Sequence, residues 1–121
     1  MGGKPLLAAT ALDALVESVR AAEAADRDLD WRIHCRNGLY GVGAYGSHPK
    51  YTASLDAALT LVPPEHDWIV AAVNGQVGGT PYACVGSTEA HYGETPVLSL
   101  CLAALRAEVA LRQVLRNGRA L

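Results

Sequence analysis

Side chains that can bind an anion gather around one short stretch of the sequence, Tyr51-Thr52-Ala53-Ser54. The hydroxyls of Thr52 and Ser54 can cap a helix that begins beside them, where free backbone N–H groups and the helix dipole favour negative charge. Arginine pairs with phosphate in a fork geometry, and aromatic rings offer faces to a base. We therefore predict a site for a small anionic, nucleotide-like ligand. The side chains expected to line this site are Arg32, Arg36, Tyr40, His48, Lys50, Tyr51, Thr52 and Ser54.

A purely structural interpretation of the same residues stays open. The hydroxyls can serve only as helix caps, Trp31 can fill the core, and tyrosine hydroxyls can lie at the surface in water. A rival anion site is the helix start at Thr95-Pro96, where the neighbouring Glu94 repels negative charge.

Three other kinds of chemistry find no support in the spacing. Gly41-Val42-Gly43-Ala44-Tyr45-Gly46 matches the letters of a dinucleotide fingerprint, but Pro49 rather than a helix follows it. The histidines and cysteines lack the spacing of metal ligands. Ser54-Leu55-Asp56 lacks the G-x-S-x-G turn that exposes a nucleophile. We predict a protein that is not an enzyme and holds neither a metal nor a cofactor.

The elements that must position the anion site follow from the spacing of apolar residues. Leu55, Ala58, Leu59 and Val62 recur at helical spacing before Pro63-Pro64, which predicts a short central helix. A longer helix is expected from a cap at Thr10 to about residue 25, after a loose lead-in at residues 1–9. Asp26 should cap another short helix, which ends at Asn37-Gly38.

The last helix is expected at about residues 95–117, with Thr95 as its cap, Pro96 in its first turn and Asn117-Gly118 at its end. Its buried stripe should comprise Leu98, Leu102, Leu105 and Val109. Leu111 and Leu115 lie beyond that stripe. They predict either a homo-oligomer contact through this helix or a helix end that wraps the core.

Two or three strands complete the prediction. Residues 68–73 are apolar on both faces, which predicts a middle strand. A second strand is expected near residues 82–85, after a turn that contains Asn74-Gly75, and a glycine-rich strand at residues 39–45 is the third. The fold class predicted is α/β of the α+β type, a three-layer α-β-α sandwich. Its small antiparallel sheet of about three strands should lie between helices from both ends of the chain.

Composition limits the setting. At 121 residues, with half of them apolar, the chain forms one domain over residues 1–121. A net charge of −2 argues against binding to a nucleic acid polymer, and no apolar run is long enough to cross a membrane. An odd count of three cysteines indicates reduced thiols, so the expected location is the cytoplasm.

Four ordered blocks of the sequence carry a resemblance to a known family. They are Asp26-Arg27-Asp28-Leu29-Asp30 with Ile33, the stretch from Tyr51 to Pro63, Trp68, and the stretch from Thr95 to Ala107. Together they resemble the phage α-β-α ("ABA") sandwich domain family of small phage and prophage proteins. The resemblance implies a phage origin and an α-β-α fold, and it carries no catalytic or binding residues over to this chain.

Two hypotheses of function follow. The first is a non-enzymatic phage accessory protein that sequesters a nucleotide-like immune signal in the host cytoplasm, by analogy with anti-defence sponge proteins. The alternative is a protein-binding or structural phage module that blocks a host protein or joins an assembly, with no small-molecule ligand.

Overall fold

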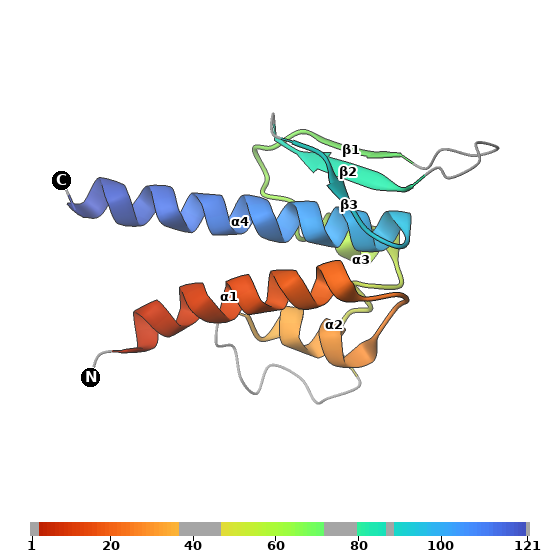
Figure 1. The fold of residues 1–121 in the computed structure, drawn as a ribbon, viewed down its shortest axis with the longest axis horizontal. Helices are drawn as coiled ribbons and strands as arrows, with labels where there is room; N and C mark the ends of the chain where they lie inside the picture. Colours follow the sequence, from red (N-terminus) through yellow and green to blue (C-terminus); the bar gives the residue numbers. More distant parts are fainter. Residues whose placement is uncertain (1–2, 37–46, 72–79, 87–88, 121) are drawn as a thin grey trace.

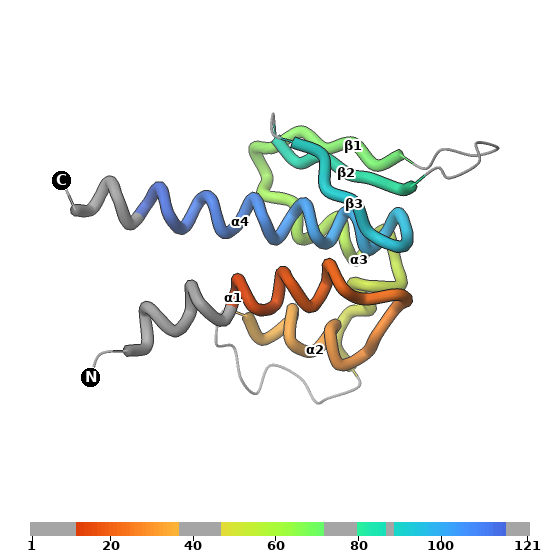
Figure 2. Tube along the Cα trace, in the orientation of Figure 1, coloured from red at the N-terminus to blue at the C-terminus, as the bar shows by residue number. Residues whose placement is uncertain are grey.

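The fold is described here from a computed structural model, for residues 3–36, 47–71, 80–86 and 89–120 (Figures 1 and 2). These parts form helices and a small sheet, with a helix at each end of the chain. The elements in chain order are α1 (Gly3–Ala21), α2 (Arg27–His34), α3 (Leu55–Leu59), β1 (Trp68–Ala71), β2 (Tyr82–Val85), β3 (His91–Tyr92) and α4 (Pro96–Ala120).

Helix α4 is the element around which the other elements pack. Its segment 98–105 is buried on every side, because the sheet, α1 and α3 all pack against it. A helix that is covered all round must be apolar all round, and this segment reads Leu-Ser-Leu-Cys-Leu-Ala-Ala-Leu. Its one polar side chain, Ser99, accepts a hydrogen bond from the backbone N–H of Gly93 (2.8 Å) and donates one to the carbonyl of Thr95 (3.0 Å).

The predicted start of α4 is confirmed. The backbone N–H of Leu98 donates to the Thr95 hydroxyl at 3.0 Å, and Pro96 is the first helical residue. The predicted stripe of Leu98, Leu102, Leu105 and Val109 is buried. The predicted stop at Asn117-Gly118 is wrong, because the helix continues to Ala120.

The sheet is antiparallel in the order β1-β2-β3, with Trp68 opposite Val85 and Tyr82 opposite Tyr92. The strand at 82–85 is confirmed and is the middle strand. The prediction of 68–73 as the middle strand is wrong, because β1 lies at the edge of the described sheet and its Ile69 is 58% exposed. The third strand of the described sheet, β3, lies in a segment where no strand was predicted. The strand predicted at 39–45 and the Asn74-Gly75 turn lie outside the described residues.

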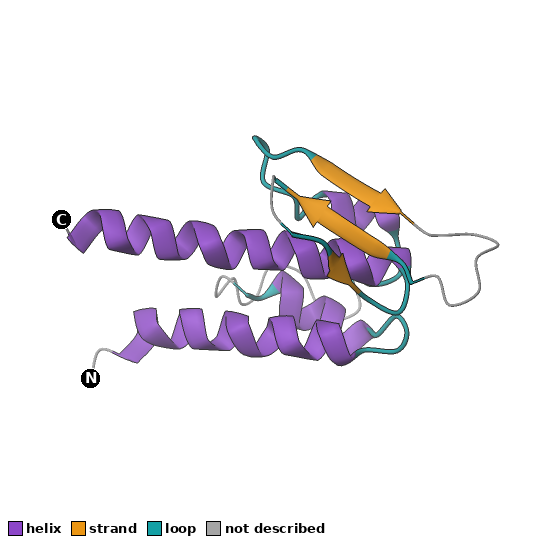
Figure 3. Cartoon of the chain, turned by 45° about the horizontal axis from the view of Figure 1, so that its top comes forward, coloured by secondary structure: helices purple, strands orange, loops and turns teal. Residues whose placement is uncertain are grey.

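The α+β class, the three-stranded antiparallel sheet and the helices at both ends of the chain are confirmed. The order of the layers differs from the prediction (Figures 1 and 3): the sheet is an outer layer, α4 and α3 form the middle, and α1 with α2 forms the other side. Ala83 and Val85 of β2 are buried toward α4. Among the described elements, α4 is the helix that covers the sheet, so the opposite face of the sheet stays open.

The N-terminal helices differ in how well their ends were predicted. Helix α1 begins at Gly3 rather than after a cap at Thr10, and it ends at Ala21 rather than near residue 25. Asp26 caps α2 as predicted, accepting from the backbone N–H groups of Asp28 (2.7 Å) and Leu29 (3.1 Å). Helix α2 ends at His34, before the predicted Asn37-Gly38 stop. None of the described helices has the length and apolarity required to cross a membrane.

Candidate functional site

The centre of the predicted anion site is a buried carboxylate that the sequence analysis did not single out. Asp30 of α2 is fully buried, and its Oδ1 accepts from the Thr52 backbone N–H (2.8 Å) and hydroxyl (2.7 Å). The Thr52 hydroxyl oxygen in turn accepts from the backbone N–H of Asp26 (2.8 Å). The backbone N–H and hydroxyl of Thr52, which were expected to bind a ligand, therefore hold α2 against segment 47–54.

Arg27 closes the other side of this network. Its guanidinium contacts Asp30 Oδ2 at 2.8 Å and donates to the carbonyls of His48 (3.0 Å) and Pro49 (3.3 Å). His48 is buried, with Nε2 3.2 Å from the carbonyl of Arg27. A buried charge is tolerated when it is paired and its remaining oxygens are hydrogen-bonded, and Asp30 meets both conditions.

Tyr51 and Ser54 are also occupied by the fold. The Ser54 hydroxyl accepts from the backbone N–H of Ala57 at 3.2 Å, so Ser54 is confirmed as the cap of α3, whereas Thr52 is not a cap. Tyr51 is buried, and its carbonyl accepts from the Cys101 thiol at 3.1 Å. Burial raises the pKa of Tyr51, which the charge of Arg36 partly offsets.

The two predicted arginines are held by different helices. Arg36 forms an ion pair with Glu108 of α4 at 2.9 Å, and the same carboxylate pairs with Arg112 at 2.6 Å. Arg32 donates to the hydroxyl of Ser18 on α1 at 3.0 Å. Lys50 is exposed, and Tyr40 lies outside the described residues.

The structure thus brings together part of the predicted set. His48, Thr52 and Ser54 lie on one segment, 47–54, which is fastened to α2 through Asp30 and Arg27. The sequence carried a signal for this network, because Asp30 lies between Leu29 and Ile33 on the buried side of α2. A carboxylate on an apolar face requires partners, and Thr52 and Arg27 provide them.

Three rings pack beside this network. The ring of Trp31 lies 5.2 Å from that of His48 in an edge-on arrangement and 5.8 Å from that of His34, measured between ring centroids. The two histidine rings lie 6.3 Å apart. Trp31 is half-buried and packs against these rings between α2 and segment 47–54, so it does not fill the core as the purely structural interpretation expected.

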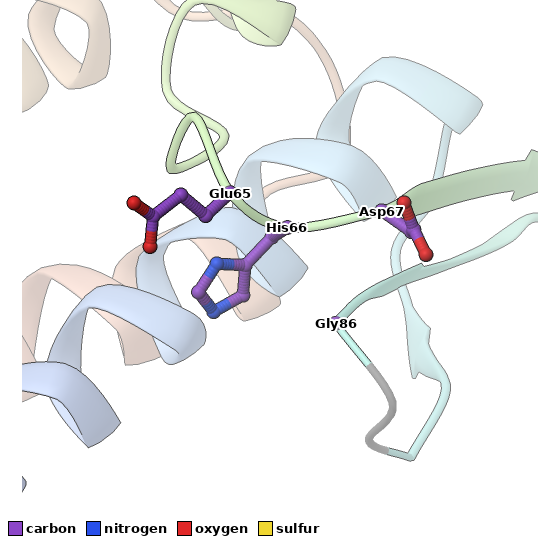
Figure 4. Close-up of a pocket in the computed structure, with 4 residues that line it drawn as sticks. All are labelled: Glu65, His66, Asp67 and Gly86. Atoms are coloured by element: carbon purple, nitrogen blue, oxygen red, sulfur yellow. The ribbon is translucent and has the colours of Figure 1, made fainter.

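A shallow cavity of about 350 Å³ is lined by Glu65, His66, Asp67 and Gly86 (Figure 4). The His66 Nδ1 atom is buried and makes no hydrogen bond within the described residues. The Asp67 carboxylate points away from the imidazole in Figure 4, so the three side chains do not converge on one point. No group of three or more potential metal-ligating side chains was found in the described part of the chain.

Sequence reasoning missed the face of the sheet that no described helix covers. Cross-strand partners share a face, so the register places one set of side chains on the side away from α4. Tyr92 is 56% exposed on this face, and its ring lies 5.9 Å from that of Tyr82. We call this set the outer face, and its members are Ile69, Ala71, Tyr82, Cys84 and Tyr92.

The outer face carries no charged side chain among the described strands. A signal existed in the sequence, because Trp68-Ile69-Val70-Ala71 is apolar at every position. That pattern fits a strand buried on both faces, and it fits equally an edge strand with an uncovered apolar face. A second exposed apolar strip lies on α4, where Leu111 is 38% exposed, Val114 65% and Leu115 64%.

Comparison with protein-family models, with curated proteins and with solved structures found no match to this chain.

Proposed function

We propose that this chain is a non-enzymatic protein-binding module that uses the outer face of its sheet. The observation that carries this proposal is an apolar, aromatic and uncharged sheet face that no described helix covers. Large exposed apolar patches on a folded domain mark interaction surfaces. Tyrosine is enriched in such surfaces, because its ring provides contact area and its hydroxyl tolerates water.

The charges around the outer face define the partner. Residues 65–94 contain four acidic side chains and no lysine or arginine. Asp67 directly precedes β1, Glu89 precedes β3 and Glu94 follows it, and all three are exposed. A partner that fits would therefore present an apolar centre with basic residues around it, since opposite charges at the rim favour association.

Sequestration of a nucleotide-like ligand is the weaker proposal. It would use Thr52 and Arg36, which are engaged with Asp30 and Glu108, and an anion would meet the buried Asp30 carboxylate beside Thr52. Helix α3 has five residues, so its dipole is small. The phage setting rests on the resemblance stated above, and within it a protein-binding module fits the role of blocking a host protein or joining an assembly.

Site-specific photo-crosslinking tests the proposal. A photoreactive aromatic residue replaces Tyr92 on the outer face or, as the matched control, the exposed Asp56 on α3. We expect a discrete adduct with a different protein from position 92 and none from position 56. Mass spectrometry separates that adduct from one between two copies of this chain. Equal adducts from both positions, or none from position 92, would contradict the proposal.

A further inference from the structure

The free edge of β1 has the features of a strand that pairs with another strand. Edge strands are usually protected by a charged residue, a proline or a bulge, because their unpaired backbone groups attract other strands. Trp68-Ile69-Val70-Ala71 has none of these, and β1 has one neighbour, β2, in the described sheet. Figures 1 and 3 show β1 at the rim of the sheet, with no described element beyond it.

The hydrogen-bond pattern defines which backbone groups point outward. The backbone N–H of Gly86 donates to the carbonyl of Asp67 at 2.8 Å, one position before the pair Trp68 and Val85. Antiparallel pairs alternate between hydrogen-bonded and non-hydrogen-bonded positions. Asp67, Ile69 and Ala71 therefore point their backbone groups toward β2, whereas Trp68 and Val70 point theirs toward the free edge.

We propose that β1 pairs with β1 of a second copy, antiparallel, about a twofold axis that passes beside Ile69. This register places Trp68 opposite Val70 of the second copy and Val70 opposite Trp68, so every outward-pointing group of both strands finds a partner. The two three-stranded sheets then become one continuous sheet. The two outer faces become one surface of twice the area.

Charge and side-chain exposure favour a second copy as the occupant. In this register Asp67 lies opposite Ala71 of the second copy, so the two Asp67 carboxylates do not face each other and do not repel. Every side chain of β1 itself is uncharged. Trp68 lies on the face of its buried neighbour Val85 but is itself 45% exposed at the edge. Pairing would place the Trp68 ring beside Val70 of the second copy, on the face of the sheet toward α4. The dimer would therefore cover an aromatic ring that is partly exposed to water in the single chain.

This inference goes beyond the proposed function, because the edge of β1 and the outer face are different surfaces. A module that is monomeric can still bind a partner through Tyr92, and a dimer can form without one. The photo-crosslinking experiment reports on the outer face, and the experiment below reports on the edge.

Sedimentation of the full chain is the first test. We expect a mass of two copies for the parent and of one copy, a twofold loss, for Ile69→Lys, since the lysines would face each other across the axis. The matched control is Val114→Lys on α4, which replaces a side chain of similar exposure and should leave the dimer unchanged. A monomeric parent, or a dimer that Val114→Lys breaks and Ile69→Lys does not, would overturn the inference.

Cysteine crosslinking tests the register itself. Residues opposite each other at a non-hydrogen-bonded position have Cα atoms about 4.5 Å apart, within the range that a disulfide spans. In a Cys35→Ser, Cys84→Ser background, Ile69→Cys should form a covalent dimer in a glutathione redox buffer. Val114→Cys should not, and neither should Trp68→Cys, which does not lie opposite itself. Crosslinking of Trp68→Cys in place of Ile69→Cys would exclude this register.

Discussion

The buried network of Asp30 makes the sharpest prediction about stability. Asp30 is fully buried and accepts two hydrogen bonds from Thr52 while it pairs with Arg27. Arg27 is 35% exposed and also donates to the carbonyls of His48 and Pro49, so it keeps acceptors when Asp30 is removed. The Thr52 backbone N–H, in contrast, stays buried without an acceptor, and the deleted side chain leaves space in the packed interior. We therefore expect Asp30→Ala to lower the free energy of unfolding by about 3 kcal/mol.

A loss of that size is a large part of the stability of a small domain, which is about 5–15 kcal/mol. Asp30→Asn is therefore measured beside it. The amide keeps an acceptor for Thr52 but removes the charge that Arg27 needs, so we expect a smaller loss, about 2 kcal/mol. Thr52→Val deletes the hydroxyl and keeps the backbone N–H. The double variant with Asp30→Asn should show a coupling of about 1 kcal/mol between the two side chains.

Chemical denaturation followed by circular dichroism measures these values. The matched control is Asp28→Asn, which replaces an exposed carboxylate on the same helix and should cost less than about 1 kcal/mol. If Asp30→Ala costs no more than this control, the network does not hold α2 to segment 47–54 and the reasoning is refuted.

Three further predictions concern other parts of the core. Gly93→Ala should cost about 1–3 kcal/mol in denaturation, because the added Cβ would lie 2.8 Å from the Ser99 backbone nitrogen; a loss below about 0.5 kcal/mol would contradict this. Burial raises the pKa of Cys101 to about 12. A thiol reagent at pH 8 should therefore modify Cys35 and Cys84 first and react with Cys101 only when the protein unfolds. Equal modification rates for all three cysteines would contradict this prediction. Burial lowers the pKa of His91 below 6.5 in the folded protein. As the pH drops, the unfolded chain therefore binds a proton at His91 before the folded chain does. The free energy of unfolding should then decrease as the pH falls below about 6.5. His91→Gln should weaken that fall, and an unchanged pH profile would count against it.

Local rules predicted the helix starts that depend on local contacts. Asp26, Ser54 and Thr95 each accept hydrogen bonds from N–H groups two or three residues further along the chain, so their roles follow from short-range geometry. Thr10 failed as a cap because α1 begins at Gly3, where the sequence shows no capping side chain. Thr52 failed because its hydroxyl is engaged with Asp30, 22 positions away.

The apolar pattern predicted β1 and β2 but neither β3 nor which faces of the sheet are covered. Trp68-Ile69-Val70-Ala71 is apolar on both faces, a pattern typical of a strand between two layers of helices. The structure leaves one face and one edge of this strand open, because the only helix against the described sheet is α4. The sequence could not distinguish apolar residues that are buried from apolar residues that are exposed, such as Trp68 and Ile69.

The anion site was predicted from residue types that occur near one another in the sequence. Arg32 and Arg36 are four positions apart, yet one reaches Ser18 on α1 and the other Glu108 on α4. These partners lie 14 and 72 positions away, and pairing of this kind depends on how the helices pack. A positive side chain near a helix start can bind an anion only when it does not already form an ion pair with a carboxylate of the same chain.

The binding affinity of the outer face tests the central claim most directly. The protein captured by crosslinking at position 92 would be purified and titrated against the parent chain, Tyr92→Asp and the α4 control Val114→Asp. Loss of an aromatic anchor at the centre of an interface costs about 2 kcal/mol or more, a factor of about thirty in Kd. We predict that increase for Tyr92→Asp and a change of less than about twofold for Val114→Asp. An unchanged Kd for Tyr92→Asp would contradict the account.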